Sequence, residues 1–108
     1  MSHNLRAHFR LEYPPSERPT LDIKGEKYEV LDLSEKGAKL ACRGKLKPQI
    51  DSVIKGIIKF RDGKECPIAG TVLRVNPEAD WCVLQLTLGV PLAKMMEEQL
   101  IIIRKYRK

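Results

Sequence analysis

The stretch SVIKGIIKFRDGKECPIAGTVLRV, Ser52–Val75, carries the strongest fold signal of the sequence. Its first half alternates apolar and lysine side chains, as a strand with one buried face does. The Asp-Gly pair inside Arg61–Lys64 is typical of a tight hairpin turn, and a second strand, Cys66–Val75, follows it. We therefore predict two antiparallel strands joined by this turn. The residues expected on the buried side of the first strand are Ile54, Ile58 and Phe60, with Lys55 and Lys59 opposite.

Similar short runs lie on both sides of this hairpin and are separated by turn signals. In the last of them every second residue is apolar, from Cys82 to Leu88. Six short strands at this spacing are typical of an antiparallel barrel or sandwich. We therefore predict an all-β domain, a six-stranded antiparallel β-barrel. The four additional runs are TLDIKG (20–25), YEVLDLS (28–34), AKLACR (38–43) and WCVLQLTL (81–88).

The C-terminal residues, about 91–106, follow a helical pattern instead. Pro91 stands at the start, where its fixed φ suits a first helical turn. Basic residues end the segment, which suits the negative end of the helix dipole. Two strands are apolar on both faces, so we expect this helix to pack on the barrel; binding of a partner by its apolar stripe is the alternative. The stripe consists of Leu92, Met95, Met96, Leu100 and Ile103.

The length of 108 residues fits one domain with a single core. Residues 1–18 are polar, basic and interrupted by prolines, so we predict a flexible N-terminal arm there and the barrel with its helix over residues 19–108. The formal net charge of +6 favours an anionic partner.

Catalytic and metal-binding patterns are scarce in this sequence. Its three cysteines include no C-x-x-C pair, and we interpret them as buried thiols of a reducing compartment. The two histidines, His3 and His8, leave few candidate general bases or metal ligands. We therefore expect a binding module that is not an enzyme and carries no metal and no cofactor. Because no signal peptide or membrane-spanning run is evident, we expect a cytoplasmic protein.

Two short motifs could form a binding site together. Arg6 and Arg10 stand four apart in the arm, and DLSEKG supplies Asp32, Ser34 and Gly37 where one predicted strand gives way to the next. Asp32 and Ser34 have short side chains that can bond backbone amides or a ligand. Gly37 can supply a positive φ for a tight turn. Taken alone, the second motif favours a plain turn between strands.

The order R-x-x-x-R, first strand, D-x-S-x-x-G and C-terminal helix resembles the PilZ domain over essentially the whole chain. The resemblance implies a bacterial receptor for the second messenger cyclic di-GMP, bound where the arm wraps against the barrel. The two motifs carry the implied ligand contacts. Many members have a further arginine directly before the first motif, and Leu5 stands at that position here. The resemblance therefore leaves open whether the protein binds one nucleotide or two. His8 and Arg74 are weaker candidates for the same site.

The chemistry of the motif residues agrees with that ligand. A guanidinium group can grip a phosphate or the Hoogsteen edge of guanine with two parallel hydrogen bonds. Since no output domain is recognisable, we hypothesise that the arm orders on ligand binding and changes a surface that a separate protein recognises, in motility, biofilm or virulence control. We expect a monomer or weak dimer. The alternatives are an adaptor of the same fold that binds no nucleotide, and a small basic barrel that binds RNA or single-stranded DNA.

Overall fold

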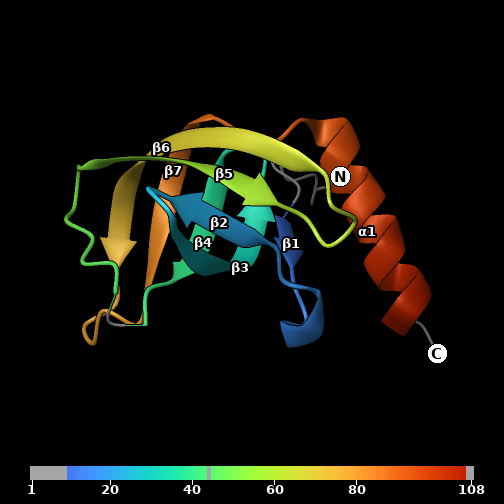
Figure 1. Ribbon diagram of the computed structural model, residues 1–108, viewed down its shortest axis with the longest axis horizontal. Coiled ribbons are helices and arrows are strands. Elements are labelled where there is room, and N and C mark those ends of the chain that lie inside the picture. Colours follow the sequence, from blue (N-terminus) through green and yellow to red (C-terminus); the bar gives the residue numbers. More distant parts are fainter. Residues whose placement is uncertain (1–9, 44, 107–108) are drawn as a thin grey trace, which may run out of the picture.

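Seven strands, a short 3-10 turn and one long helix make up the described part of this computed structural model, residues 10–43 and 45–106 (Figure 1). The elements are β1 (Arg10–Glu12), η1 (Pro15–Glu17), β2 (Thr20–Ile23), β3 (Glu26–Ser34), β4 (Gly37–Ala41), β5 (Val53–Lys59), β6 (Glu65–Val75), β7 (Trp81–Leu88) and α1 (Leu92–Tyr106).

Six of the strands close into an antiparallel barrel in the order β3-β2-β5-β6-β7-β4, and a β3–β4 pairing completes the circle. β3 serves two neighbours because its pairing shifts between Val30 and Asp32: its first half pairs with β2 and its second half with β4. Closure of this kind leaves no free sheet edge inside the barrel. The structure therefore confirms the predicted six-stranded barrel and adds β1 as an extra strand against the end of β3.

The predicted turns and strand faces are mostly confirmed. Gly25 and Gly63 both have φ near +90° in the β2–β3 and β5–β6 turns, a conformation that favours glycine. Ile54, Ile58 and Phe60 are buried as predicted. Of the alternating apolar residues of β7, Cys82, Leu84 and Leu86 are buried, whereas Leu88 at the end of the strand is half exposed. The fully buried centre includes Leu21, Leu33, Leu40, Ile58, Val72, Cys82 and Leu84.

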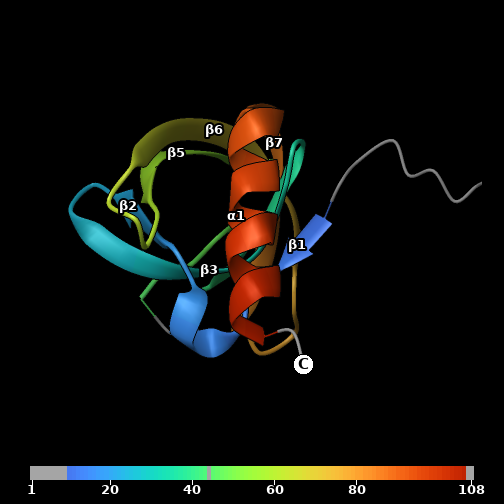
Figure 2. The same cartoon turned by 90° about the vertical axis from the view of Figure 1, so that its right-hand side faces the viewer.

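α1 lies across one end of the barrel, as predicted, but with a different face toward it (Figure 2). Met95 and Glu98 are buried, and Ile102 packs against the core. Glu98 can take a core-facing position because Tyr13 and Lys94 contact its carboxylate. An apolar count along the helix overlooks such a glutamate, which is why the predicted stripe is only partly correct. Apart from Met95, its members are substantially exposed: Leu92, Met96, Leu100 and Ile103.

Residues 10–18 are structured, although we predicted them as part of a flexible arm. β1 pairs with β3 in the register Leu11↔Leu33, and Tyr13 N–H donates to the carbonyl of Leu31. Leu11 and Tyr13 are both buried in the core, so this segment gains apolar contacts as well as backbone hydrogen bonds. The remainder of the predicted arm, residues 1–9, lies outside the described residues.

Among the helices that the structure describes, none combines the length and the apolar character that a bilayer span requires.

Candidate functional site

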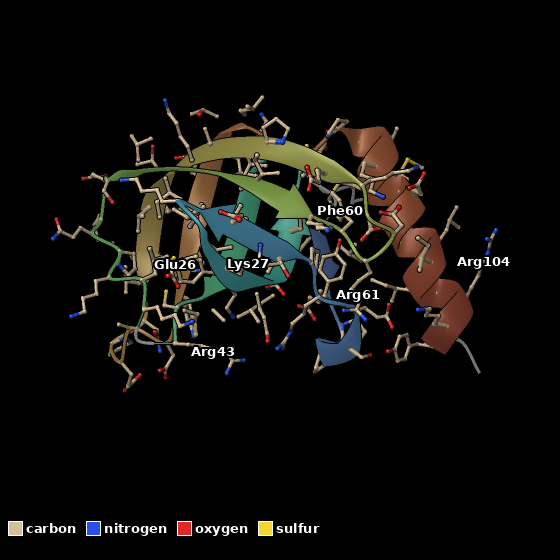
Figure 3. All side chains as sticks on the ribbon, viewed as in Figure 1. Glu26, Lys27, Arg43, Phe60, Arg61 and Arg104 are labelled. Atoms are coloured by element: carbon tan, nitrogen blue, oxygen red, sulfur yellow. The ribbon has the colours of Figure 1, made fainter. Side chains whose placement is uncertain are left out.

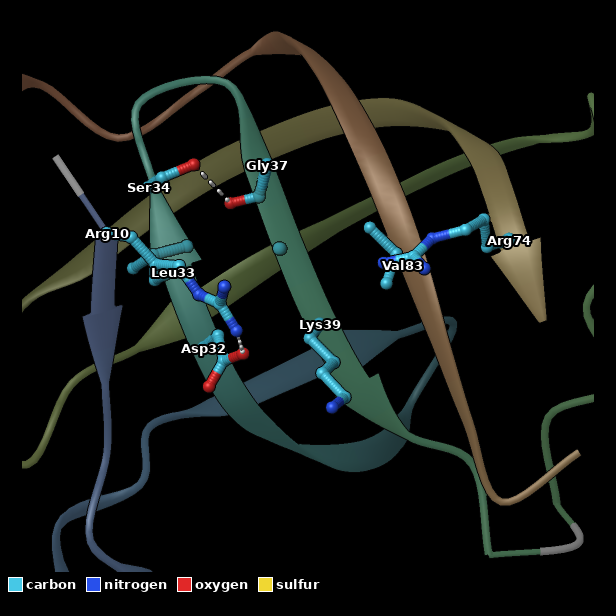
Figure 4. Close-up of a pocket in the computed structure, with 9 residues that line it drawn as sticks. Arg10, Asp32, Leu33, Ser34, Gly37, Lys39, Arg74 and Val83 are labelled. Carbon is cyan, nitrogen blue, oxygen red and sulfur yellow. Dashed lines mark hydrogen bonds and ion pairs between the residues drawn. The ribbon is translucent and has the colours of Figure 1, made fainter. Parts of the chain in front are cut away.

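A pocket of about 210 Å³ opens on the outer surface of the barrel, where β1 meets β3 and β4 (Figure 4). Its lining comes from five strands, because the β4–β7 and β6–β7 pairings bring β6 and β7 alongside β4. The lining residues are Arg10, Asp32, Leu33, Ser34, Gly37, Ala38, Lys39, Arg74 and Val83.

Arg10 and Asp32 form the closest charged contact in this pocket. The register of β1 against β3 places Arg10 opposite Ser34 and Glu12 opposite Asp32, so Arg10 of the first motif meets the second motif at one end of β3. An Arg10 Nη2 atom lies 2.8 Å from Asp32 Oδ2 and 3.4 Å from a carboxylate oxygen of Glu12. The hydrogen bond to Asp32, together with the attraction between the charges, raises the pKa of Arg10 above its ordinary value. Arg10 therefore stays cationic, half exposed, and directed across the pocket toward Asp32 (Figure 4).

Ser34 and Gly37 bracket the β3–β4 turn at the rim of the pocket. The Ser34 hydroxyl donates a long hydrogen bond of 3.4 Å to the Gly37 carbonyl. Gly37 is not among the described residues with positive φ, so the conformational role predicted for it is wrong. Its lack of a side chain serves packing instead: a Cβ there would lie 3.2 Å from Ser34 Oγ and 3.5 Å from the Leu84 carbonyl oxygen.

The structure thus brings together five of the residues predicted for the site. Arg10, Asp32, Ser34, Gly37 and Arg74 all line the pocket. The other three candidates, Arg6, Leu5 and His8, lie outside the described residues.

Sequence reasoning missed two residues of this region, Lys39 and Trp81. Lys39 lines the pocket, and its Nζ atom lies 4.3 Å from the centroid of the Trp81 ring. The Cζ atom of Arg74 lies 5.9 Å from the same centroid. Alternation along 38–43 already placed Lys39 on the outer face, two residues after Gly37. That spacing was the available signal for Lys39; Trp81 is brought near only by the β4–β7 pairing.

A second polar cluster joins the segment after β1 to α1. The Tyr13 hydroxyl donates to Glu98 Oε1 at 2.9 Å, although the two residues are 85 positions apart. Burial, and to a smaller extent repulsion from Glu98, raises the pKa of Tyr13. The hydroxyl therefore keeps the proton that it donates. Lys94 Nζ lies 3.4 Å from the other oxygen of Glu98. The buried carboxylate is therefore held from both sides.

Glu17, in η1, makes the other half of this connection. Lys105 Nζ lies 3.1 Å from Glu17 Oε1, and the Tyr106 hydroxyl donates to Glu17 Oε2 at 3.3 Å. Burial alone would raise the pKa of Glu17, but these contacts outweigh it and lower the pKa. Figure 3 shows Arg61 on the side of the barrel that faces α1, whereas Arg104 points away from the barrel. We call Tyr13, Glu17, Lys94, Glu98 and Lys105 the helix junction.

Comparison with known proteins gives consistent results. The PilZ domain family matches residues 4–106. Among solved structures, the inhibitor of motility MotI/DgrA of Bacillus subtilis has a similar fold, with a TM-score of 0.67 at 15% sequence identity. The alignment covers 96% of this chain and 52% of that one, so the chain spans about half the length of its structural neighbour. A comparison with curated proteins found no match.

Proposed function

Because the chain belongs to the PilZ domain family, as the match over residues 4–106 shows, we propose that it is a cytoplasmic receptor for cyclic di-GMP. The family consists of non-catalytic binding and adaptor domains related to this second messenger. The observation that carries the proposal is the pocket in which Arg10 of one motif meets Asp32, Ser34 and Gly37 of the other.

The pocket offers suitable groups for both parts of the ligand. Cyclic di-GMP carries two phosphates and two guanines. The guanidinium of Arg10 can bond a phosphate or a guanine edge through two parallel hydrogen bonds. Asp32 can accept hydrogen bonds from the donor-rich edge of guanine, and the small Gly37 lets a ligand approach the backbone. Arg6 completes the family motif, and we assign it to the same ligand.

The Arg10–Asp32 ion pair gives ligand binding a structural consequence. A nucleotide that bonds both residues would bind beside this contact or compete with it, because Arg10 Nη2 lies 2.8 Å from Asp32 Oδ2. Arg10 begins β1, and the chain runs from there directly to Tyr13 and Glu17, which hold α1. We therefore propose that ordering of the arm on the ligand is transmitted to the helix end of the barrel. The output is recognition by a separate protein, in control of motility, biofilm formation or virulence.

Titration calorimetry with cyclic di-GMP tests this proposal. We expect Arg6→Ala and Arg10→Ala each to weaken binding by about tenfold or more, since a hydrogen bond to a charged group contributes roughly 1.5–3 kcal/mol. Arg104→Ala removes the same charge at an exposed position away from the pocket and should leave the affinity unchanged. Unchanged affinity in both motif variants would contradict the site assignment. A wild-type protein without affinity for the nucleotide would support the adaptor alternative. The same titration counts the nucleotides bound per chain.

A further inference from the structure

The pocket contains two cations that no carboxylate neutralises within the described residues. Arg10 and Asp32 pair with each other, whereas Lys39 and Arg74 form no ion pair with any described residue. Lys94 and Lys105, at the helix junction, do have acidic partners. The pocket therefore keeps two positive charges beyond those that its own aspartate balances.

Strand pairing holds these two cations side by side. Lys39 of β4 stands opposite Val83 of β7, and Arg74 of β6 stands opposite the same Val83 from the other side. Lys39, Val83 and Arg74 thus form one row across three strands. Trp81 lies two residues before Val83, which places it on the same face of β7. Figure 4 shows the Lys39 side chain on β4 and that of Arg74 beside Val83.

The Trp81 ring is the contact that Lys39 and Arg74 share. The Lys39 ammonium lies 4.3 Å from the ring centroid and the Arg74 guanidinium 5.9 Å from it, both within the range of a cation–π interaction. Such a contact restrains a long side chain without neutralising its charge. A salt bridge to a carboxylate would have restrained it and removed the charge as well. The arrangement therefore leaves both charges available to an anion.

We propose that Lys39 and Arg74, positioned by Trp81, form an anion subsite on the barrel that binds a phosphate of the ligand. The inference rests on the proposed function, because it assigns a part of the same nucleotide to these residues. It also accounts for the charge balance of the pocket: two unneutralised cations face a ligand that carries two phosphodiester charges. The arm arginines then act from one side of the ligand and the barrel cations from the other.

Titration calorimetry with Lys39→Gln and Arg74→Gln tests the subsite. We expect each variant to weaken cyclic di-GMP binding by about tenfold, as for loss of a charge-assisted hydrogen bond. Lys59→Gln is the matched control, because Lys59 is an exposed lysine on β5 outside this pocket. It should change the affinity by less than about twofold. If the nucleotide binds and both subsite variants retain full affinity, the inference is wrong while the proposed function stands.

Trp81 is a positioning residue in this scheme, and a double-variant comparison separates that role from a merely structural one. Trp81→Leu should weaken binding about threefold in the otherwise normal protein, and Trp81→Phe should restore part of the loss. In the Lys39→Gln/Arg74→Gln background, Trp81→Leu should cause no further loss. A loss of equal size in both backgrounds would show that Trp81 acts independently of the two cations. Thermal unfolding by circular dichroism confirms that each variant is folded.

The single tryptophan provides a second readout if the wild-type protein does not bind cyclic di-GMP. Inorganic pyrophosphate is then the probe, with Trp81 fluorescence as the signal. A wild-type response that disappears in Lys39→Gln/Arg74→Gln would support the anion subsite although the proposed receptor function had failed. No response to either anion would overturn both.

Discussion

The pocket and the helix junction both contain several charged side chains, but their lysines have different kinds of partner. At the junction, Lys94 is nearly buried and contacts Asp62 at 2.6 Å, Glu97 at 2.8 Å and Glu98 at 3.4 Å. Burial alone would lower the pKa of Lys94, but its three carboxylate neighbours raise it well above the ordinary value. In the pocket, Lys39 Nζ lies 4.3 Å from the centroid of the Trp81 ring and forms no ion pair with any described residue.

This difference separates charges that hold the fold together from charges that remain available to a ligand. A buried cation without a partner is costly, so Lys94 needs its carboxylates for the protein to fold. Lys39 is partly exposed on the outer face of the barrel, so it retains some hydration and can exchange water for an anion. Replacing the lysine by an uncharged residue should therefore reduce stability strongly at the helix junction and only slightly in the pocket.

Among the charged residues of the two regions, Lys94→Met should have the largest effect on stability. It leaves Asp62, Glu97 and the buried Glu98 close together without their shared cation, and we expect a loss of about 2 kcal/mol or more in the free energy of unfolding. Lys39→Met is the matched control and should change stability by less than about 0.5 kcal/mol. Urea denaturation followed by circular dichroism measures both. Equal losses in the two variants would remove the distinction between the regions.

Tyr13→Phe should have the next largest effect. It removes the hydroxyl that donates to Glu98 while leaving the buried ring in place, so one carboxylate oxygen loses its donor. We expect a loss of about 1–2 kcal/mol by urea denaturation. Tyr28→Phe is a suitable control, because Tyr28 is also a buried tyrosine but its hydroxyl makes no side-chain hydrogen bond within the described part of the chain. A stability equal to that of wild type would show that the Tyr13–Glu98 contact contributes nothing.

Acid should weaken the helix junction in a way that depends on Glu17. The pKa of Glu17 is lowered in the folded protein, so its contribution to stability is present above the ordinary value of 4.5 and is lost as the pH falls through the lowered pKa. Asp62 and Glu97, whose pKa values are lowered mainly by hydrogen bonds from Lys94, add loss in the same direction. We expect the urea midpoint to decrease below about pH 4.5, and Glu17→Gln to show a smaller decrease. An identical pH profile in the variant would contradict the role given to Glu17.

Leu100→Gln should have the smallest effect, below about 0.5 kcal/mol. Its side chain is half exposed on the outer face of α1, whereas Met95 on the inner face is fully buried. Met95→Ala, by contrast, should cost about 2–4 kcal/mol, as truncation of a buried methionine does. Thermal and urea unfolding of the two variants would establish which face of the helix packs on the barrel. A large loss from Leu100→Gln would mean that the outer face is covered.

Features encoded in short segments were predictable from the sequence, and those that depend on distant partners were not. The β5–β6 hairpin could be predicted because its alternation and its Asp-Gly turn lie within one stretch. Asp32, Ser34 and Gly37 could be assigned to the site by motif. The inward face of α1 could not be predicted, because it includes Glu98, whose partner Tyr13 is 85 residues away. Trp81 was missed for the same reason: only the pairing of β4 with β7 brings it beside Lys39.

β1 stands outside the closed circle of the barrel and pairs with β3 alone. Its departure would free only the edge of β3 at residues 32–34 and would leave the barrel closed, since β3 and β4 remain joined. Leu11 of β1 and the adjacent Tyr13 are part of the core, whereas the side chains of Arg10 and Glu12 are exposed and contribute little to it. On the proposed function, substitutions at the exposed positions of β1, Arg10 and Glu12, can retune the ligand concentration at which the receptor responds while its melting temperature stays nearly constant.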